Sequence, residues 1–373
     1  MYIKSLECKN FRNYESLCAS FNPGTNVFYG DNAQGKTNIL EGMFLCGTTK
    51  SHRGNKDKEM IRFGEEEAHI RMVLHRKHAD HRIDMHLRKS KTKGVAIDGI
   101  PIRKASELFG IVNFVFFSPE DLNIIKNGPA ERRKFIDSEM CQLNKLYLSE
   151  LSAYNKVLAQ RNKLLKDMAF SPSLAATLSV WDEQLISYGK NLIKARESFV
   201  KQLNLISGEI HSQLTGGKEQ IEILYEPDTS AEAFEENLTA NREKDLRYKM
   251  SSVGPHRDDI CVLINGIDIR KYGSQGQQRS AALSLKLSEI QMIRTIVKTT
   301  PVLLLDDVLS ELDSSRQRYL LNSIKDIQTF ITCTGMDDLL ENDFPIDQIF
   351  RVVSGTIRSE ASGMDSNREI NNE

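Results

Sequence analysis

The chain has 373 residues and a formal net charge of −1, and 40% of its residues are hydrophobic and 27% charged. This composition is typical of a globular protein with a real core, and the length is enough for two domains or for one domain with a large insertion. No apolar run approaches the roughly 20 residues needed to span a bilayer, and the N-terminus lacks the apolar stretch of a secretory signal, so we expect no membrane association.

The cysteines and the overall charge set further limits. The six cysteines occur singly, without a C-x-x-C pair or clustered histidines, which argues against a zinc site and against a disulfide framework. We therefore expect reduced thiols in a cytoplasmic protein. A net charge of −1 creates no overall positive field, so any contact with DNA must use a local basic patch.

The first third of the sequence predicts a series of short strands separated by turns. Hydrophobic residues alternate with polar ones in several of them, and Asp98-Gly99 is a typical hairpin turn. The last strand is apolar apart from Asn113, which indicates burial on both faces. The predicted strands are 2–8, 17–21, 26–29, 69–74, 83–87 and 111–117.

The middle of the sequence has the periodicity of two long helices. Between 147 and 168, and again between 174 and 199, apolar residues recur at heptad spacings. Ser171 is a good N-cap and Pro172 a good first residue for the second helix. We predict an antiparallel helical hairpin whose longer arm reaches roughly 50 Å, and a plain pair of core helices stays open as the alternative.

Strands and helices alternate again in the last third. Asn265-Gly266 predicts a hairpin turn, 276–297 a helix and 301–305 a buried strand, whereas the polar tail beyond Ile357 predicts disorder. The predicted fold is an α/β domain assembled from both ends of the chain around an inserted helical lobe. We place its N-terminal part at 1–118, the helical insertion at 119–254 and its C-terminal part at 255–373.

A phosphate-binding loop follows the predicted strand 26–29. It matches the pattern G-x-x-x-x-G-K-T and precedes an amphipathic helix. The two glycines allow backbone N–H groups to face the β- and γ-phosphates of a nucleotide, and the helix N-terminus adds its positive dipole end. Lys36 supplies a compact cation and Thr37 a hydroxyl ligand for Mg²⁺, so we predict ATP and Mg²⁺ as cofactors. The predicted nucleotide-binding residues are Gly30, Asp31, Asn32, Ala33, Gln34, Gly35, Lys36 and Thr37.

A second element of the site is the apolar strand that ends at Asp306-Asp307. A carboxylate at the end of a buried strand lies at the C-terminal edge of the sheet, beside the phosphate loop. We predict that Asp306 holds Mg²⁺ together with Thr37, directly or through water. Asp307 could orient or deprotonate the attacking water. We therefore predict Asp307 as a catalytic residue, together with the phosphate cation Lys36.

A third element opens the helix that precedes this strand. Small and polar residues stand at its start, where a hydroxyl and backbone N–H groups can face a phosphate. An ordinary N-capping turn is the alternative. The order of this element and the carboxylate strand, with Leu312-Asp313 just after, favours a nucleotide contact. The residues of this signature are Ser274, Gln275, Gly276 and Gln277.

Together these elements resemble an ABC-type P-loop ATPase. In that class the signature of one protomer closes on the ATP held by the other, which implies an ATP-dependent homodimer in which the signature acts in trans. More narrowly, the chain resembles the RecF family of bacterial recombinational-repair proteins along nearly its whole length. The segments that carry this resemblance are 10–14, 30–38, 51–53, 118–120, 254–259, 273–279 and 303–313.

The resemblance implies a DNA-binding protein of replication and repair. RecF-like proteins bind ATP, dimerise on DNA, work with RecR- and RecO-type proteins to load recombinase at gaps, and support the SOS response. The DNA is single-stranded, or a gapped or junction duplex. Asp307 stands where most ABC members have glutamate, and Thr334 replaces the histidine that often follows the next strand. We therefore expect a weak, DNA-stimulated ATPase that acts as a timer.

Several basic residues carry further predictions. Arg12 and Arg53 could each approach a phosphate of ATP, with a salt bridge as the alternative. Between 71 and 104 the sequence has ten Lys or Arg against three Asp. Here we predict DNA contacts, with a solvated hairpin face as one alternative and the lysines of the helical arm as another location. The predicted DNA-contacting residues are Lys89, Lys91 and Lys93.

Four other functions share parts of this pattern. In a membrane-transporter ATPase subunit the phosphate loop and the signature are close in sequence, whereas in this chain the helical insertion separates them. A chromosome-organising ATPase of the SMC type needs coiled-coil arms of hundreds of residues. A small-molecule P-loop kinase has no use for the Ser-Gln-Gly-Gln element. An ABC-type ATPase with a role outside repair is the remaining alternative.

Overall fold

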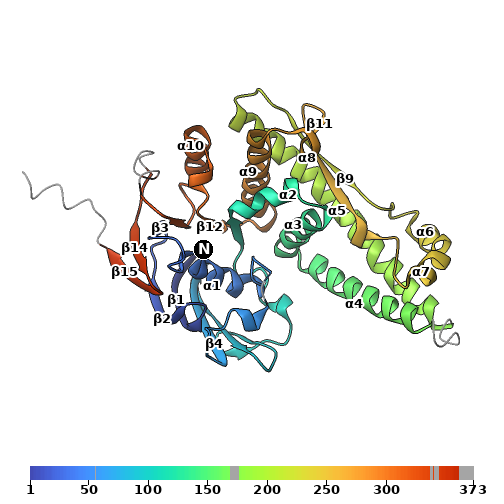
Figure 1. Ribbon diagram of the computed structural model, residues 1–373, viewed down its shortest axis with the longest axis horizontal. Coiled ribbons are helices and arrows are strands. Elements are labelled where there is room, and N and C mark those ends of the chain that lie inside the picture. Colours follow the sequence, from blue (N-terminus) through green and yellow to red (C-terminus); the bar gives the residue numbers. More distant parts are fainter. Residues whose placement is uncertain (55, 169–175, 337–338, 340–343, 361–373) are drawn as a thin grey trace, which may run out of the picture. The chain divides into compact units, whose positions relative to one another are not determined.

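The computed structural model of the protein describes residues 1–54, 56–168, 176–336, 339 and 344–360 (Figure 1). It divides into two compact units. The first combines Met1–Pro119 with Ile293–Glu373, and the second consists of Glu120–Met292. The first unit is therefore assembled from both ends of the chain, as the sequence predicts.

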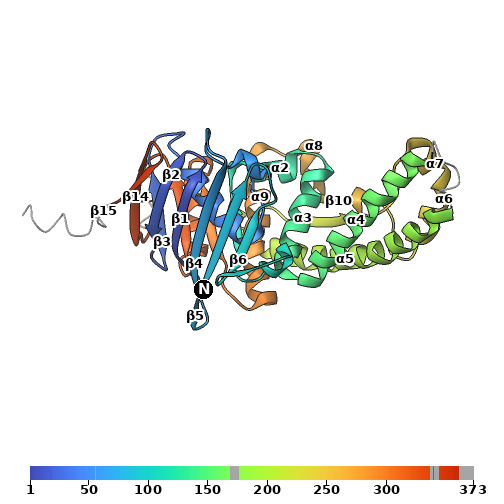
Figure 2. The same cartoon turned by 90° about the horizontal axis from the view of Figure 1, so that it is seen from below.

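One sheet of the first unit is antiparallel, with the strand order β2-β1-β4-β5-β6-β7. Figure 2 shows β2, β1 and β4 next to one another. Residues along β4 and β5 alternate between buried and accessible positions, as expected of a sheet with one face on the core. Asp98 and Gly99 both have positive φ values, 53° and 83°, which suit the predicted two-residue hairpin turn. The strands are β1 (Tyr2–Phe11), β2 (Tyr14–Ser20), β4 (Glu67–Arg76), β5 (Ala79–Arg88), β6 (Gly94–Ile97) and β7 (Ile100–Pro101).

The other sheet of the first unit has the order β15-β14-β3-β13-β12-β8. Its strands from β14 to β8 are parallel, and β15 is antiparallel to β14. The carboxyl ends of β3 and β12 therefore meet at one edge of the sheet, separated by β13 alone. The strands are β3 (Thr25–Tyr29), β8 (Phe114–Phe117), β12 (Val302–Asp306), β13 (Thr329–Cys333), β14 (Gln348–Val353) and β15 (Thr356–Glu360).

Helix α1 (Lys36–Thr48) packs against both sheets of the first unit. Its Leu40 and Met43 belong to one core with Ile70 of the first sheet and Leu304 and Phe330 of the second. The beginning of the helix is thereby fixed at the end of β3. A shorter helix, α10 (Ser314–Ser323), begins at Asp313, whose side chain accepts hydrogen bonds from two backbone N–H groups.

The second unit is mainly helical and contains one small antiparallel sheet, with the order β11-β10-β9. Asn265 and Gly266 have φ values of 51° and 78° and form the predicted hairpin turn. The strands are β9 (Ile221–Glu226), β10 (Asp259–Ile264) and β11 (Ile267–Asp268). The helices are α2 (Leu122–Lys126), α3 (Pro129–Leu143), α4 (Lys145–Asp167), α5 (Leu178–Thr215), α6 (Phe234–Ala240), α7 (Arg242–Tyr248), α8 (Ile269–Tyr272) and α9 (Gln275–Met292).

Helices α4 and α5 form the predicted antiparallel hairpin. Figure 1 shows them side by side. Arg161 near the end of α4 bonds to Asp182 near the start of α5, and Arg196 further along α5 bonds to Tyr147 at the start of α4. The 38 residues of α5 make it about 57 Å long. The predicted start at Ser171 and Pro172 lies outside the described residues, and the α-helix as described begins at Leu178.

Two boundaries differ from the sequence-based prediction. The segment 255–292 belongs to the second unit, because β10 pairs with β9 and α9 packs along α5. The predicted disorder beyond Ile357 is wrong for 358–360, which pair with β14 as the last residues of β15, and the rest of that tail lies outside the described residues. Among the described helices, none is both long and apolar enough to cross a membrane.

Candidate nucleotide site

The phosphate loop connects β3 to α1 and requires glycine at both glycine positions of its pattern. Gly30 has a φ of 149°, and a Cβ there would lie 2.4 Å from the carbonyl oxygen of Val352. Gly35 has a φ of 115°, and a Cβ there would lie 2.5 Å from Nδ2 of Asn13. Neither the backbone conformation nor the space tolerates a side chain, so each glycine is needed for the path of the loop.

Neighbouring side chains hold the phosphate loop through hydrogen bonds. The Asn13 amide donates to the carbonyl of Gln34 at 2.8 Å and accepts from the Asn38 amide at 2.8 Å. The Tyr14 hydroxyl donates to the carbonyl of Gly35 at 3.1 Å. The contacts to Gln34 and Gly35 use backbone carbonyls and no backbone N–H of the loop. The sequence signal for Asn13 and Tyr14 was their place in the RecF-like segment 10–14, but their supporting role was not predicted.

Lys36 lies across the loop. Its Nζ donates to the carbonyls of Gly30 at 2.5 Å and Asp31 at 2.8 Å, and the residue is only 7% exposed. The ammonium group is thus held next to the loop backbone rather than extended into solvent. Phosphate oxygens could replace these two carbonyls as partners without a large movement of the side chain.

The structure brings the two predicted Mg²⁺ ligands together. The Thr37 hydroxyl donates to Oδ1 of Asp306 at 2.6 Å, although 269 residues separate them in sequence. Thr332 on the strand between them also donates to Oδ1 of Asp306, at 2.8 Å. A hydroxyl and a carboxylate are hard oxygen ligands, so this pair fits Mg²⁺.

Asp307 is fixed through its backbone. It has a φ of 53°, a left-handed conformation that Asp adopts more readily than most residues. Its N–H lies 3.2 Å from the carbonyl and 3.0 Å from Oγ1 of Thr332, and its own carbonyl accepts a hydrogen bond from Ser310 at 2.9 Å. The main chain around this carboxylate is therefore well defined, which is necessary for a group that orients water.

Arg12 adopts the geometry of the salt-bridge alternative. Its guanidinium donates twice to the buried carboxylate of Glu41, with both distances 2.7 Å, and Ser51 donates to the same carboxylate at 2.5 Å. Burial tends to raise the pKa of Glu41, but the bonds from Arg12 and Ser51 outweigh it and hold this pKa below its ordinary value. Arg53 is exposed, with its backbone N–H on the Ser51 hydroxyl. The partner Glu41 was not predicted from the sequence.

The signature residues lie in the second unit, at the start of α9. The backbone N–H of Ser274 donates to the Gln277 side chain at 3.0 Å, and the N–H of Gln277 donates to the Ser274 hydroxyl at 3.2 Å. This reciprocal pair is a capping box, so the N-capping alternative describes the local geometry correctly. It does not exclude the predicted role, because an exposed hydroxyl that accepts from Gln277 can still donate its own proton to a phosphate.

Comparison with known proteins identifies the family. A family model described as the RecF/RecN/SMC N-terminal domain matches residues 2–358. The DNA replication and repair protein RecF of Agathobacter rectalis is 61% identical over 96% of this chain and 99% of its own length. The corresponding protein of Clostridium perfringens is 47% identical over 96% of this chain and 100% of its own length. The chain belongs to the RecF family.

Solved structures agree with this assignment. A structure of the recombination mediator protein RecF with ATP, in the RecFOR pathway, superimposes with a TM-score of 0.90 at 36% identity, covering 96% of this chain and 98% of that chain. An Smc head domain from Pyrococcus furiosus gives a TM-score of 0.57 at 16% identity, which shows the shared fold alone. The predicted fold, an ABC-type P-loop ATPase head assembled from both ends of the chain, is confirmed.

The RecF-like segment 254–259 forms part of the core of the second unit. Gly254 has a φ of 133°, and a Cβ there would lie 2.7 Å from the Tyr154 hydroxyl. The buried Asp258 accepts from Arg196 at 2.8 Å and also from Tyr225. Arg132 donates twice to Asp259, at 2.6 and 2.8 Å. This family segment is therefore held mainly by ion pairs with distant residues, which the sequence did not reveal.

The predicted DNA contacts lie on a surface that is less basic than the sequence indicates. Lys89 pairs with Glu66 at 3.1 Å, and Lys93 pairs with Asp57 at 2.8 Å. Both acids lie outside the basic window 71–104. Lys91 is exposed. This RecF-family surface is thus closer to the solvated-face alternative, and its DNA contacts stay a prediction.

Proposed function

We propose that the protein is an ATP-switched, DNA-binding protein of DNA replication and recombinational repair. The observation that supports it most directly is the 2.6 Å contact between Thr37 and Asp306, beside a phosphate loop crossed by Lys36. A hydroxyl, a carboxylate and a cation near the carboxyl ends of β3 and β12, two parallel strands separated by β13, form the arrangement that binds a nucleoside triphosphate with Mg²⁺. The relatives named above as DNA replication and repair proteins, and the solved RecF with ATP, support a role of this chemistry in repair.

Each residue of the site has a role in this proposal. The N–H groups of 30–35 contact the β- and γ-phosphates, Lys36 donates to phosphate oxygens, and Thr37 and Asp306 would hold Mg²⁺. Bound there, the ion would neutralise charge that develops on the phosphates. Asp307 orients the attacking water and accepts its proton. Arg12 supports the loop region through Glu41, and Arg53 is the exposed cation available to a phosphate.

The signature provides the second half of the site in trans. Ser274, Gln275, Gly276 and Gln277 of one protomer contact the γ-phosphate of ATP bound by another, so that ATP drives formation of a homodimer. The aspartate at 307 is one methylene shorter than glutamate, which moves the carboxylate away from the water and slows hydrolysis. The protein then acts as a timer: ATP closes the dimer on DNA, and slow hydrolysis, stimulated by DNA, releases it.

The biological setting follows from the family. We infer that the protein acts in the cytoplasm on single-stranded, gapped or junction DNA, with partners of the RecR and RecO type. Its role there is to help load recombinase at gaps and to support the SOS response. The solved relatives act in the RecFOR pathway, which supports partners of this kind.

The proposal is tested by two measurements on the same preparation. Steady-state ATPase activity is measured with and without single-stranded and gapped DNA, and the mass in solution is measured with ATP, with ADP and without nucleotide. We expect a slow rate that rises with DNA and a dimer only with ATP. A constant monomer together with a rate that DNA does not change would reject the switch.

A further inference from the structure

Three side chains of types that bind metal ions meet on the solvent-facing side of the first sheet. Glu67 and His69 are two residues apart on β4, so both lie on the same face of the strand. His86 on β5 is the direct cross-strand partner of His69. The ligand atoms of the three residues all lie within 4.8 Å of one another. Within the described part of the chain, this is the one group of His, Cys, Asp or Glu side chains whose spacing suits a metal ion.

Both imidazoles are directed at the same carboxylate. Nε2 of His86 lies 2.8 Å from Oε2 of Glu67, and Nε2 of His69 lies 3.6 Å from Oε1. The two rings are stacked, with their centroids 4.1 Å apart. In a tetrahedral site with bonds of about 2.0–2.2 Å, neighbouring ligand atoms are roughly 3.4 Å apart. The two separations to Glu67 bracket this value, so small rotations of exposed side chains would place the three ligand atoms around one ion.

The sheet fixes the positions of both histidines. Directly opposed residues of an antiparallel pair have Cβ atoms about 4.5–5.5 Å apart. Ile70 follows His69 on β4 and Met85 precedes His86 on β5, and both are buried in the core below the sheet. Because the core already holds the backbone, binding of an ion would order side chains alone, which keeps its entropic cost small.

The charges around these three residues limit the kind of ion that they can bind. Lys9 on β1 is exposed and is the cross-strand partner of His69 on the other side. Arg88 is the cross-strand partner of Glu67, and its Nη2 donates to the carbonyl of Thr92 at 3.0 Å. The next charged residues along the same face pair with one another: Glu7, Arg71 and Asp84.

Two cations next to one carboxylate create no negative field that would attract a hard cation. Mg²⁺ and Ca²⁺ are held by oxygen ligands, and Glu67 is the one oxygen donor among the three residues. Imidazole nitrogen, by contrast, forms direct bonds with Zn²⁺ and related transition-metal ions. The ligand set therefore favours an ion of that class.

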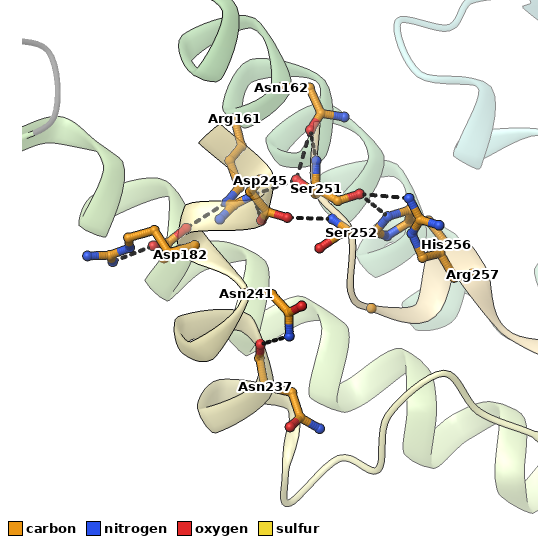
Figure 3. A network of polar contacts seen from close by, with 12 residues as sticks. Arg161, Asn162, Asp182, Asn237, Asn241, Asp245, Ser251, Ser252, His256 and Arg257 are labelled. Carbon is orange, nitrogen blue, oxygen red and sulfur yellow. Dashed lines mark hydrogen bonds and ion pairs between the residues drawn. The ribbon is translucent and has the colours of Figure 1, made fainter. Parts of the chain in front are cut away.

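The acids of the second unit have partners of a different kind. Arg161 is fully buried and donates to Asp182 at 2.6 Å and to Asp245 at 2.7 Å (Figure 3). These carboxylates have a permanent cation as their partner, which excludes a metal ion. The partners of Glu67 are two histidines, and neutral imidazole is itself a metal ligand.

We propose that Glu67, His69 and His86 bind one Zn²⁺ ion through a carboxylate oxygen and the two Nε2 atoms, with water in the fourth position. The site uses none of the six cysteines, and 19 residues separate Glu67 from His86, so the argument from local sequence spacing does not apply to it. The bound ion would connect β4 to β5 and add positive charge to this face. It depends on neither ATP nor DNA.

Calorimetric titration of the full chain with Zn²⁺, without nucleotide and in excess Mg²⁺, tests the proposal. Excess Mg²⁺ competes for the oxygen ligands of Thr37 and Asp306 but not for imidazole nitrogen. We expect one Zn²⁺ per chain and a melting temperature that rises with Zn²⁺ concentration. His69→Gln and His86→Gln should each lower the affinity for Zn²⁺ at least about tenfold, because even a residue that only orients a ligand contributes about 10–100-fold.

Two further variants serve as controls. His75 lies on the same strand and the same face, 2.8 Å from Asp80, so it pairs one imidazole with one carboxylate. His75→Gln should therefore leave Zn²⁺ binding unchanged. Lys9→Gln removes a cation next to His69 and should strengthen binding. Melting without Zn²⁺ establishes that each variant is folded, as expected for changes on the accessible face of the sheet.

The outcomes separate this site from other Zn²⁺ binding. A wild type that binds no Zn²⁺ in excess Mg²⁺ would overturn the proposal. Zn²⁺ affinity that either His69→Gln or His86→Gln leaves unchanged would also overturn it, because both imidazoles are required as ligands. An equal loss of affinity in His75→Gln would place the ion elsewhere on the sheet.

Discussion

The phosphate loop of the first unit and the segment 245–259 of the second are both fixed in position, but by different interactions. The loop is shaped by two glycines and supported by neutral hydrogen bonds from Asn13 and Tyr14 to its carbonyls. The segment 245–259 is held by guanidinium groups, above all Arg161 and Arg196, on buried carboxylates. One region relies on backbone geometry and the other on buried charge.

The difference corresponds to what each region has to do. A neutral hydrogen bond contributes only about 0.5–1.5 kcal/mol, so the loop can exchange partners when phosphates arrive. Removing one partner of a buried ion pair costs about 3–5 kcal/mol, so the second region behaves as a fixed support. Residues that act on a ligand should therefore tolerate substitution without unfolding, whereas residues of the buried network should not.

The largest effect is expected for Arg161→Met. It leaves Asp245 buried without its guanidinium, so the free energy of unfolding should fall by about 3–5 kcal/mol in urea denaturation. Arg242→Met is the matched control, because Arg242 is 42% exposed and Asp182 keeps its bond to Arg161. That control should cost less than about 1 kcal/mol. Equal stability losses in the two variants would show that the buried network does not hold this region.

Lys36→Ala should instead weaken ATP binding and leave the stability of the fold almost unchanged. It removes the cation proposed to contact phosphate. The loop loses two hydrogen bonds from Nζ but keeps its glycine conformations and the bonds from Asn13 and Tyr14. ATP affinity should therefore fall by about 30-fold or more while the melting temperature changes little. Titration calorimetry with ATP and Mg²⁺ measures the first, and thermal melting without nucleotide measures the second. Lys50→Ala removes an exposed lysine of the same unit and should retain wild-type affinity. A variant that binds ATP normally would remove Lys36 from the site.

Sequence patterns identified the first region far better than the second. The glycines, Lys36 and Thr37 lie within eight consecutive residues, and Asp306 is marked by the apolar strand before it, so the local pattern contains the chemistry. Arg161 and Asp245 are 84 residues apart, and nothing in the sequence around either indicates the other. The heptad pattern predicted the helical hairpin correctly, because helix packing has a period, whereas a buried ion pair has none.

Partners in tertiary structure also explain the remaining differences. Arg12 matched a family segment, yet its side chain bonds to Glu41, a residue that reads as part of an ordinary amphipathic helix. The charge balance of the basic window 71–104 does not include Asp57 and Glu66, which the fold places beside two of its lysines. The predicted domain boundary at 254 separates two strands that pair in the structure, because β10 joins 259–264 to 221–226 of β9. Each of these contacts depends on residues that are distant in sequence.

Asp307→Asn should separate binding from hydrolysis. The amide cannot accept a proton from water, so the ATPase rate should fall at least about tenfold, while ATP affinity and ATP-dependent assembly persist. Asp306→Asn is the comparison, because it alters the proposed Mg²⁺ ligand and should weaken binding of ATP with Mg²⁺. Hydrolysis at the wild-type rate by Asp307→Asn would show that this carboxylate does not activate the water.

The smallest effect is expected for the basic face of the first unit. Changing Lys89, Lys91 and Lys93 together to Glu should weaken DNA binding and flatten its salt dependence, with ATP binding unchanged. Because Lys89 and Lys93 are already paired with Glu66 and Asp57, the loss of DNA affinity should be small. A large loss would place the main DNA surface on this face.

Light scattering of Ser274→Arg tests whether ATP joins two protomers through the signature. Ser274 is exposed at the start of α9, and the bond that its hydroxyl accepts from the N–H of Gln277 is exposed too, so a bulky cation there should leave the core and ATP affinity intact. It should block closure on the ATP of another protomer. We expect the wild type to become dimeric with ATP and the variant to bind ATP equally well but to remain monomeric. A variant that dimerises with ATP like the wild type would show that the signature does not join the protomers.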